Sequence, residues 1–596
     1  MKVLKLGYKW IKGNRLSFLL GIVVLVVLDY IRSLVPVFIS EVYAILDPLN
    51  NKSGLPNYLY PLISNKELST QIITISIMII SIILLRDILN VIYDYQMTKA
   101  SEGIGDRIRV EFYDHVQKLP YSTLSQNQTG DLIQRSTNDI DRFKRFIGKI
   151  LPNMLNNTLL IGFYYYQMVR VDFWFATMSI AAAPILLIIS FIFYKKLSPE
   201  FEQLEEAESG YISVCQENLT NIRVVKAFNN EQSEIKKFGN KLTEYVTGWQ
   251  KTMKKMSMYW GGTDILLYLQ IIFSIFISIY YYDKGIHLSG VLLVFTCLQD
   301  VLWRSRNLGR QLNELNKTTI SVNRIEEILT LDDEFKGETG KIKDAINGKI
   351  EFKNVYYSYN DNVNPVLKDI NLVINPGETI AIIGKTGSGK TTLVNLINRL
   401  LDSTFGEILI DNINVKNYDK LYLRQNVGFC MQEPFLYSNT IYNNIGILLN
   451  NDDNNDEKIF EVAKISNIDQ DILEFKNGYD TVIGERGVTL SGGQKQRIAI
   501  SRILTENKPI LIFDDSLSAV DTNTDIKIRQ MLKERQDKAT TIIITHKILS
   551  AKDADKIVII DDGMIKNIGK HEELLLTDDL YKSIYNIQNA FESSGE

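Results

Sequence analysis

The chain has 596 residues, too many for a single hydrophobic core, so we expect at least two domains. Its 66 lysines and arginines nearly balance its 70 aspartates and glutamates, and no basic tract points to a nucleic-acid partner. The 3 cysteines and 4 histidines are widely scattered, which makes disulfides, a thiolate zinc site and a histidine metal cluster unexpected.

A first long apolar run covers residues 16–46 and follows a short basic segment. A secretory signal peptide begins in the same way. No small-residue cleavage site follows this run, however, and its apolar character continues to about Leu46. The pattern therefore favours a retained helix that spans a membrane.

Five further apolar runs come close to the ~20 residues that cross a ~30 Å hydrocarbon core. They lie near residues 70–93, 150–170, 173–194, 262–282 and 288–303. The run at residues 150–170 is the weakest, because Asn153, Asn156 and Asn157 stand at its start. Connections poor in lysine and arginine alternate with connections rich in them, and the rich ones are expected inside. The sequence thus predicts six spans with both termini cytoplasmic.

The two basic connections are each longer than about 50 residues and carry few turn signals except near their middles. A helix that rises ~1.5 Å per residue for ~25 residues would extend more than ~30 Å beyond the membrane. We therefore expect long helical stalks, with breaks at residues 119–133 and 217–228. These breaks could also be simple solvated turns.

Acidic and basic side chains occur together at three places within the expected spans. Ionisable groups at membrane depth indicate either a functional site or mutual neutralisation. Here acid and base are close in the sequence, which favours local pairing over contact with a substrate. The three pairs are Asp29 with Arg32, Arg86 with Asp87, and Asp300 with Arg304.

A charged stretch, residues 331–347, is predicted to link a transmembrane domain (1–330) to an α/β domain (348–596). The α/β domain contains a glycine-rich loop between an apolar strand and a helix. Such a loop wraps backbone N–H groups around a phosphate, and the helix N-terminus adds its dipole. The residues expected to bind polyphosphate are Gly384, Lys385, Thr386, Gly387, Ser388, Gly389, Lys390, Thr391 and Thr392.

Within this loop, Lys390 is expected to reach the β- and γ-phosphates, and the Thr391 hydroxyl to coordinate Mg²⁺. Farther along the chain, an apolar strand ends in Asp514 and Asp515. That arrangement puts an acid beside Mg²⁺ in phosphate-loop enzymes. The sequence therefore predicts a site for magnesium and a polyphosphate.

Residues 490–497 form a second glycine-rich turn at the start of a helix, where a second anion could bind. This stretch resembles the signature of ATP-binding cassette (ABC) transporters. In that family the cassettes pair head to tail, and each ATP lies between the phosphate loop of one chain and the signature of the other. The resemblance implies contact with a partner's ATP by Ser491, Gly492, Gly493 and Gln494.

Other motifs of the family are also present. Tyr359 resembles the aromatic residue that stacks on adenine. Residues 484–487 match the segment before the signature, and residues 518–521 resemble the D-loop. Residues 129–132 and 222–228 resemble the two coupling-helix regions of ABC exporters.

The resemblance covers essentially the whole chain and implies a half-transporter: a six-span helical domain with long stalks, fused to an α/β phosphate-loop cassette. Such a protein lies in the cytoplasmic membrane and uses ATP and Mg²⁺. Gln432 matches the Q-loop residue and His546 the switch histidine. The implied catalytic residues are Asp515, His546 and Gln432, and the implied magnesium ligands are Thr391, Gln432 and Asp514.

One residue departs from the family pattern. Asp515 stands where exporters of this type have glutamate, and its shorter side chain withdraws the carboxylate by roughly 1.5 Å from the water it should orient. A poor acid combined with a complete signature is typical of the degenerate subunit of a heterodimeric bacterial exporter. A homodimer in which aspartate serves adequately is the alternative.

By resemblance, the expected function is ATP-driven export of small amphipathic compounds, either drugs or lipid-like molecules. The expected partners are a second half-transporter chain and membrane lipids. One rival is a non-hydrolysing regulatory subunit, which Asp515 favours. The retained residues that oppose it are Lys390, Asp514, Gln432 and His546. The other rival is an exporter of peptides or bacteriocins.

Overall fold

The computed structural model describes most of the chain and divides into two compact units. The described residues are 7, 9–46, 61, 67–127, 129–359, 364–449, 455–484, 490–517, 522–534 and 538–593. The first unit comprises Met1–Gln117 and Thr129–Leu331, and the second comprises Lys118–Gln128 and Asp332–Glu596. The short segment Lys118–Gln128 thus belongs with the second unit, although it interrupts the first in the sequence.

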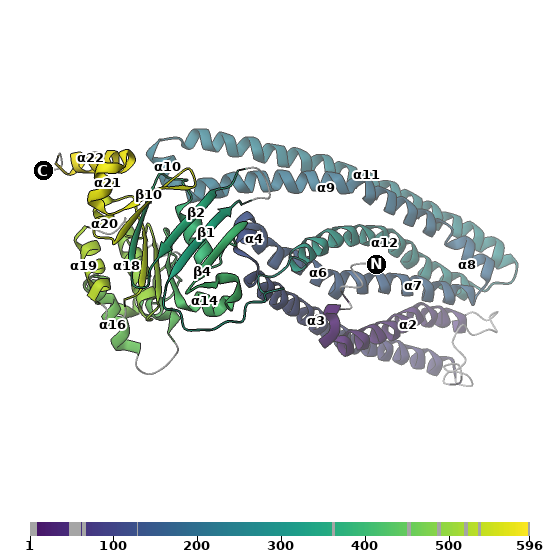
Figure 1. Cartoon of the computed structure of the whole chain (residues 1–596). Coiled ribbons are helices and arrows are strands. Elements are labelled where there is room, and N and C mark those ends of the chain that lie inside the picture. Colours follow the sequence, from purple (N-terminus) through teal and green to yellow (C-terminus); the bar gives the residue numbers. More distant parts are fainter. Residues whose placement is uncertain are drawn as a thin grey trace. The chain divides into compact units, whose positions relative to one another are not determined.

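All regular elements described in the first unit are helices (Figure 1). In chain order they are η1 (Ile11–Gly13), α2 (Arg15–Leu46), α3 (Leu68–Gln117), α5 (Thr129–Gln134), η3 (Arg135–Asp139), α6 (Ile140–Arg145), η4 (Phe146–Ile150), α7 (Leu151–Val169), α8 (Phe173–Ser179), α9 (Ala182–Thr220), α10 (Ile222–Ala227), α11 (Glu231–Asp283) and α12 (Leu288–Leu329). Buried aliphatic side chains such as Val37, Leu186 and Leu298 form a common core between them.

Two of these helices are much longer than a membrane crossing requires. α3 has 50 residues and α11 has 53, so at ~1.5 Å per residue each extends for roughly 75–80 Å. α9 and α11 run side by side and are joined through α10 (Figure 1). The predicted long helices are confirmed.

A short helix of 6 residues stands at each predicted break, α4 (Tyr121–Gln126) at the first and α10 at the second. The first break follows from Pro120, whose extended backbone cannot continue α3. At the second break, α9 ends at Thr220 with Asn221 as its C-cap, and Asn229 after α10 adopts φ 52°, in the left-handed region. Both breaks are therefore built as helical tips.

Five segments are long and apolar enough to cross a membrane. They are Arg15–Leu46, Leu68–Gln117, Phe173–Thr220, Glu231–Asp283 and Leu288–Gln311. Five of the six predicted spans lie within them. The remaining span corresponds to α7, a helix of 19 residues that does not meet this measure of apolar character among the described residues. A sixth crossing stays a prediction.

The asparagines near the start of α7 lie against charged side chains of other helices. Asn156 Nδ2 donates to Asp29 Oδ1 in α2 at 2.6 Å. In α12, Arg304 Nη1 donates to Asn156 Oδ1 and Asn157 Oδ1 at 3.2 and 2.9 Å. α7 is poor in apolar residues at this level because its amides satisfy buried charges.

Two of the three predicted local pairs at membrane depth interact as expected. Arg86 Nη2 and Asp87 Oδ1 are 2.8 Å apart and form the expected ion pair. Asp29 is attracted by Arg32, as predicted, and also by Arg304 of α12. Asp29 and Arg304 in addition hydrogen-bond the amides of α7, as described above. Sequence proximity therefore predicted two pairs but not the additional contacts between helices, and the pair of Asp300 with Arg304 stays a prediction.

The second unit contains two sheets, and the predicted α/β domain is confirmed (Figure 1). The first sheet has the strand order β2-β1-β4-β5, and the second has the order β10-β9-β3-β8-β7-β6. The strands are β1 (Ile350–Tyr357), β2 (Leu367–Ile374), β3 (Thr379–Gly384), β4 (Phe405–Ile410), β5 (Ile413–Asn414), β6 (Val427–Cys430), β7 (Ile510–Asp514), β8 (Thr540–Ile544), β9 (Lys556–Asp561) and β10 (Met564–Gly569).

Helices and short turns of 3₁₀ helix accompany these sheets. They are α4, α13 (Lys390–Ile397), η5 (Val415–Asn417), α14 (Lys420–Asn426), α15 (Ile441–Ile445), η6 (Gly446–Leu448), α16 (Asn455–Ile465), α17 (Asp469–Glu474), η7 (Gly478–Asp480), α18 (Gly492–Leu504), α19 (Thr522–Glu534), α20 (Ile548–Ala551), α21 (His571–Thr577) and α22 (Asp579–Ser593).

Three parallel strands at the centre of the larger sheet position the candidate site. β8 lies between β3 and β7, and every residue of β7 and β8 is buried, as expected where both faces of a sheet are covered. The carboxyl ends of parallel strands meet at one edge of a sheet, where ligands commonly bind. β3 leads there into the glycine-rich loop, β7 ends at Asp514, and β8 precedes His546.

The predicted linker, residues 331–347, lies almost entirely within the second unit. Ile342 forms a bridge with Tyr418, and Ile346 is buried in the core beneath β1 and β2. This stretch is therefore part of the folded α/β domain as well as the covalent connection to α12.

Candidate functional site

The glycine-rich loop has the backbone conformation that the sequence predicts. Gly387 and Gly389 adopt φ 83° and 98°, in the left-handed region that favours glycine. A Cβ at Gly389 would also lie 2.7 Å from Leu367 Cδ2, and one at Gly384 would lie 2.2 Å from the Ile560 carbonyl oxygen. These glycines allow the loop to turn closely over β2 and β9 into the N-terminus of α13.

Lys390 is the first residue of α13 and is buried. Its Nζ donates to the carbonyl oxygens of Gly384 and Lys385, both at 2.9 Å. Burial lowers the pKa of Lys390, and the opposing attraction of Asp515 and Asp514 does not fully compensate. The ammonium is therefore held inside the loop, where phosphate oxygens would stabilise its charge.

A cavity of about 310 Å³ opens beside this loop. The predicted site residues that line it are Tyr359, Thr386, Gly387, Gly389, Lys390, Thr391, Thr392, Gln432, Asp514, Asp515 and His546. Gly384, Lys385 and Ser388 belong to the loop but do not line the cavity. Val366 and Ile544 line it and were not predicted, because a single apolar residue carries no chemical signal in a sequence.

Oxygen ligands suited to magnesium gather on one side of the cavity. Asp514 is buried at the end of β7 and hydrogen-bonds the side chain of Thr391. Burial raises the pKa of Asp514 and Asp515 raises it further, against the lowering effects of Thr391, Lys390 and His546. A divalent cation here would favour the ionised carboxylate. Mg²⁺ prefers one or two carboxylate or hydroxyl oxygens together with phosphates and water, so the residues present fit the ion.

Ser388 gives a second indication that the loop receives an anion. Its side chain is buried in the loop, and its Oγ has no hydrogen-bond partner within the described residues. A buried hydroxyl without a partner costs free energy unless a ligand satisfies it. A phosphate oxygen in the loop would supply the missing acceptor.

Asp515 follows Asp514 and has φ 47°, an uncommon conformation for a residue other than glycine. Its backbone N–H donates to the Ile544 carbonyl at 3.0 Å, which fixes the turn against β8. Gln432 Nε2 lies 3.4 Å from Asp515 Oδ2, so the carboxylate faces the residue that follows β6. His546 is exposed at the same cavity. The three candidate catalytic residues thus converge from three neighbouring strands.

Tyr359 lies at the mouth of the cavity and is 49% exposed. Its hydroxyl lies 3.1 Å from Thr392 Oγ1, and its ring packs edge-on against Tyr357 with centroids 5.0 Å apart. The ring is therefore held beside α13 while a face remains available to a planar ligand.

Tyr359→Ala is expected to weaken the binding of an ATP analogue by about tenfold, because base stacking contributes roughly 1–3 kcal/mol. Tyr359→Phe should bind the analogue within about twofold of wild type, since the ring is retained. Inorganic tripolyphosphate, which lacks a base, should bind all three proteins alike. Isothermal titration of the purified protein measures these affinities, and an equal loss for tripolyphosphate would contradict a role at the base.

The signature residues form a separate, exposed feature. Ser491 caps α18: its Oγ accepts from the Gln494 N–H at 3.2 Å, and Gln494 Oε1 accepts from the Ser491 N–H at 3.0 Å. Asp471 holds the same turn by accepting from Gln494 Nε2 at 3.1 Å and from Arg497 Nη2 at 2.5 Å. None of the four signature residues lines the cavity beside the phosphate loop. The N-terminus of α18 is thus preorganised by these contacts and lies outside the cavity beside the phosphate loop.

Most of the segment 484–487 and all of the segment 518–521 fall outside the described residues. Among the described residues, no group of three or more histidine, cysteine or acidic side chains suggests a preformed protein metal cage. A magnesium ion here would depend on the nucleotide for part of its coordination.

The chain is similar to known proteins along nearly its whole length. The family model for the ABC transporter transmembrane region matches residues 18–305, and the ABC transporter model matches residues 367–518. Relatives from Staphylococcus aureus strains NCTC 8325, COL and MSSA476 are each 32% identical over 589 residues. The matches cover 98% of this chain and 100% of each relative. The names of these relatives describe multidrug export ATP-binding/permease proteins.

Proposed function

The chain belongs to the ABC transporter family, and from this premise we propose that it is one subunit of a heterodimeric exporter that moves small amphipathic compounds across the cytoplasmic membrane. The observation that carries the nucleotide assignment is the convergence of Lys390, Asp514 and Tyr359 on one cavity. Mg²⁺ would be coordinated by Thr391, Gln432 and Asp514, and bound there it would neutralise charge on the β- and γ-phosphates.

The proposed reaction at this site is ATP hydrolysis, with the chain's residues in distinct roles. Loop N–H groups and Lys390 hold the phosphates, and Tyr359 orients the base. Asp515 and Gln432 would orient the attacking water, and His546 would contact the γ-phosphate. Binding of ATP would draw two cassettes together, and hydrolysis would release them.

Unequal ATP sites are supported by the contrast between Asp515 and the signature. The aspartate carboxylate meets the Gln432 amide at 3.4 Å and is one methylene shorter than the glutamate usual in such exporters. The signature turn, in comparison, has both hydrogen bonds of the capping box between Ser491 and Gln494, and Ser491 and Gly492 are exposed. A chain of this kind would complete a competent site on its partner while its own site turns over slowly.

The rival functions differ in testable ways. A symmetric homodimer would purify alone and hydrolyse ATP at two equal sites. A regulatory subunit would bind nucleotide without supporting any transport, which the intact loop and signature oppose. An exporter of peptides or bacteriocins shares all the nucleotide chemistry, so the size of the stimulating compound in an ATPase assay distinguishes it from an exporter of small amphipathic compounds.

We further propose six spans with both termini in the cytoplasm, and cytoplasmic tips at α4 and α10 that couple the spans to cassettes. The basic connections support this orientation by the positive-inside rule. The first tip, Lys118–Gln128, clusters with the second unit, which supports a role in coupling. The transmembrane domain would comprise residues 1–330 and the cassette residues 348–596, with the connecting stretch 331–347 folded onto the cassette.

The orientation predicts which cysteines react from outside the cell. Asn221→Cys at the α10 tip, in a Cys215→Ser background that removes an exposed native thiol, should not react with a membrane-impermeant maleimide in intact cells. Lys284→Cys, at the exposed turn after α11, should react. Both should react after permeabilisation. Labelling of Asn221→Cys in intact cells would contradict the proposed topology.

A further inference from the structure

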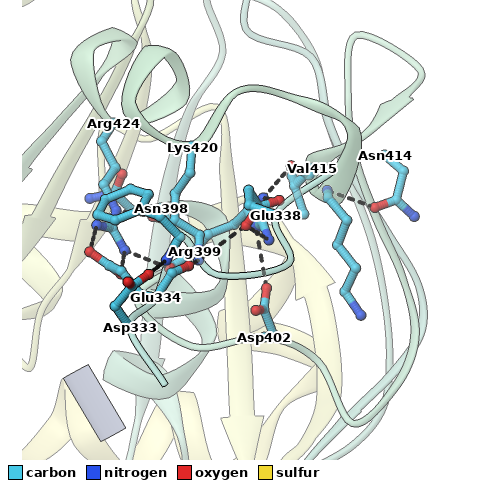
Figure 2. A network of polar contacts seen from close by, with 12 residues as sticks. Asp333, Glu334, Glu338, Asn398, Arg399, Asp402, Asn414, Val415, Lys420 and Arg424 are labelled. Atoms are coloured by element: carbon cyan, nitrogen blue, oxygen red, sulfur yellow. Dashed lines mark hydrogen bonds and ion pairs between the residues drawn. The ribbon is translucent and has the colours of Figure 1, made fainter. Parts of the chain in front are cut away.

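Residues 332–342, which we call the strap, follow α12 in the sequence and lie on the α/β domain as an ordered segment (Figure 2). The N–H groups of Lys341 and Ile342 donate to the Asn417 carbonyl at 3.0 and 3.1 Å. A Cβ at Gly340 would lie 2.1 Å from the Tyr418 carbonyl oxygen, so the strap backbone is in direct contact with the cassette there. The strap is therefore fixed on the domain that it leads into.

Two glutamates of the strap each accept both terminal N–H groups of an arginine (Figure 2). Glu334 pairs with Arg424 through two contacts of 2.8 Å, and Glu338 pairs with Arg399 through two contacts of 3.0 Å. The side chain of Arg399 is only 5% exposed and that of Glu338 is 17% exposed. Bidentate pairs of this kind are geometrically specific, and loss of one partner leaves a buried charge unsatisfied.

A third cation completes the network. Lys420 Nζ donates to the Glu334 carbonyl oxygen at 3.0 Å and lies 3.3 Å from Glu338 Oε2. Burial alone would raise the pKa of Glu338, but the hydrogen bonds and charges of Arg399 and Lys420 outweigh it and hold that pKa below its ordinary value. Glu338 is therefore ionised at neutral pH. The contribution of its ion pairs to the free energy of unfolding is lost only as the pH falls below the usual range of the glutamate pKa.

Both arginines also act on the C-terminal end of α13. Arg399 lies just beyond this helix with φ 49°, the left-handed conformation that ends many helices. Arg424 Nε and Nη2 donate to the carbonyl oxygens of Asn398 and Arg399 at 3.3 and 2.9 Å. Carbonyls at a helix C-terminus lack partners within the helix, so Arg424 supplies them. The strap thus stabilises the groups that terminate α13.

α13 is short, and its other end is the phosphate loop. The helix has 8 residues and a length of ~12 Å, and it begins at Lys390. The strap also contacts the first tip, because the Glu334 N–H donates to the Lys118 carbonyl at 2.7 Å. The strap is therefore connected to α12 by the chain and to the first tip by a hydrogen bond. Its two ion pairs hold Arg399, just beyond α13, and Arg424 of α14, which donates to the carbonyls at the end of α13.

We propose that Glu334 and Glu338 are positioning residues that couple the strap to the phosphate loop through Arg399, Arg424 and α13. The proposal rests on the proposed function only in requiring that MgATP binds at the loop. Coupling between two sites is reciprocal, so occupation of the loop must stabilise the strap as much as the strap stabilises the loaded loop.

Hydrogen–deuterium exchange of the full chain in nanodiscs tests this coupling. The magnesium complex of a non-hydrolysable ATP analogue should slow exchange of the Lys341 and Ile342 amides at least about fivefold in wild type, the lower end of usual coupling factors. In Glu334→Gln/Glu338→Gln the same addition should change these rates less than about twofold. Asp332→Asn, which removes an exposed strap carboxylate paired with Lys336, is the matched control and should behave like wild type.

The loop amides supply the internal reference. If the analogue protects residues 385–391 in wild type but leaves strap exchange unchanged, the coupling is wrong. If the analogue protects neither region at saturating concentration, the proposed nucleotide site is wrong instead. Should the double glutamine variant melt before assay, Arg399→Lys keeps the charge but loses the bidentate geometry, and it should give a strap response smaller than that of wild type.

Discussion

Gly492→Asp is expected to reduce the steady-state ATPase activity of the reconstituted complex by at least about 100-fold, whereas Asp515→Asn should reduce it less than about fivefold. Gly492 begins α18, where N–H groups are directed at a γ-phosphate of the partner chain under the proposed arrangement. A carboxylate there would repel that phosphate. Asp515 contributes little to turnover if its own site is degenerate, so its neutral isostere should matter little.

The space around Gly492 lets the effect of an added charge be separated from damage to the fold. A Cβ added at Gly492 meets no atom within 4 Å in this chain, so a side chain there does not disturb the fold by contact. Gly492→Ala is the matched control for the loss of glycine, and it should retain more activity than Gly492→Asp because it adds no charge. A loss of about 100-fold or more from Asp515→Asn, in a chain that purifies as a homodimer, would identify Asp515 as a working base and exclude the heterodimer.

Lys390→Ala is expected to weaken the binding of an ATP analogue at this chain's own loop by roughly 10- to 150-fold, which corresponds to the ~1.5–3 kcal/mol of hydrogen bonds to a charged group. Lys385→Ala is the matched control. Lys385 belongs to the same loop but does not line the cavity, and its ammonium lies 3.9 Å from Asp561. Its removal should change affinity less than about twofold.

The measurement is binding of a fluorescent ATP analogue, with the partner's phosphate-loop lysine also removed so that one site remains. Thermal unfolding of each variant controls for loss of structure, since both lysines belong to the loop that joins β3 to α13. Equal affinities of Lys390→Ala and wild type would reject the loop as the nucleotide site, whatever the transport activity.

The phosphate loop could be predicted because its chemistry is local. Residues 384–392 contain the glycines together with Lys390 and Thr391. The apolar run before them and the helix after them place the loop at the end of a strand. Asp514 was predicted from the apolar strand that it ends, and His546 was predicted by resemblance. Their meeting at one cavity follows from the order of the strands in the sheet, which the sequence alone does not give. The adjacency of β7, β8 and β3 is a tertiary result.

The strap was beyond prediction from the sequence. Its charged composition predicts a linker. Glu338 meets Arg399 and Glu334 meets Arg424 only after the chain has folded, across 61 and 90 positions. The left-handed backbone conformation of Arg399 could not be predicted either, because a positive φ at a residue other than glycine is imposed by the surrounding structure.

The amides of α7 bear on how the protein is made. A helix that carries three asparagines near one end enters a bilayer less readily by itself than its neighbours do. Asn156 can meet Asp29, which is synthesised earlier, but Arg304 emerges from the ribosome about 150 residues later. If α7 crosses the membrane, its final seating must await α12. Biogenesis would then include a late, post-insertion step in which α12 holds α7 in its final position. An Arg304→Leu chain should show incompletely integrated intermediates in pulse-labelled membranes.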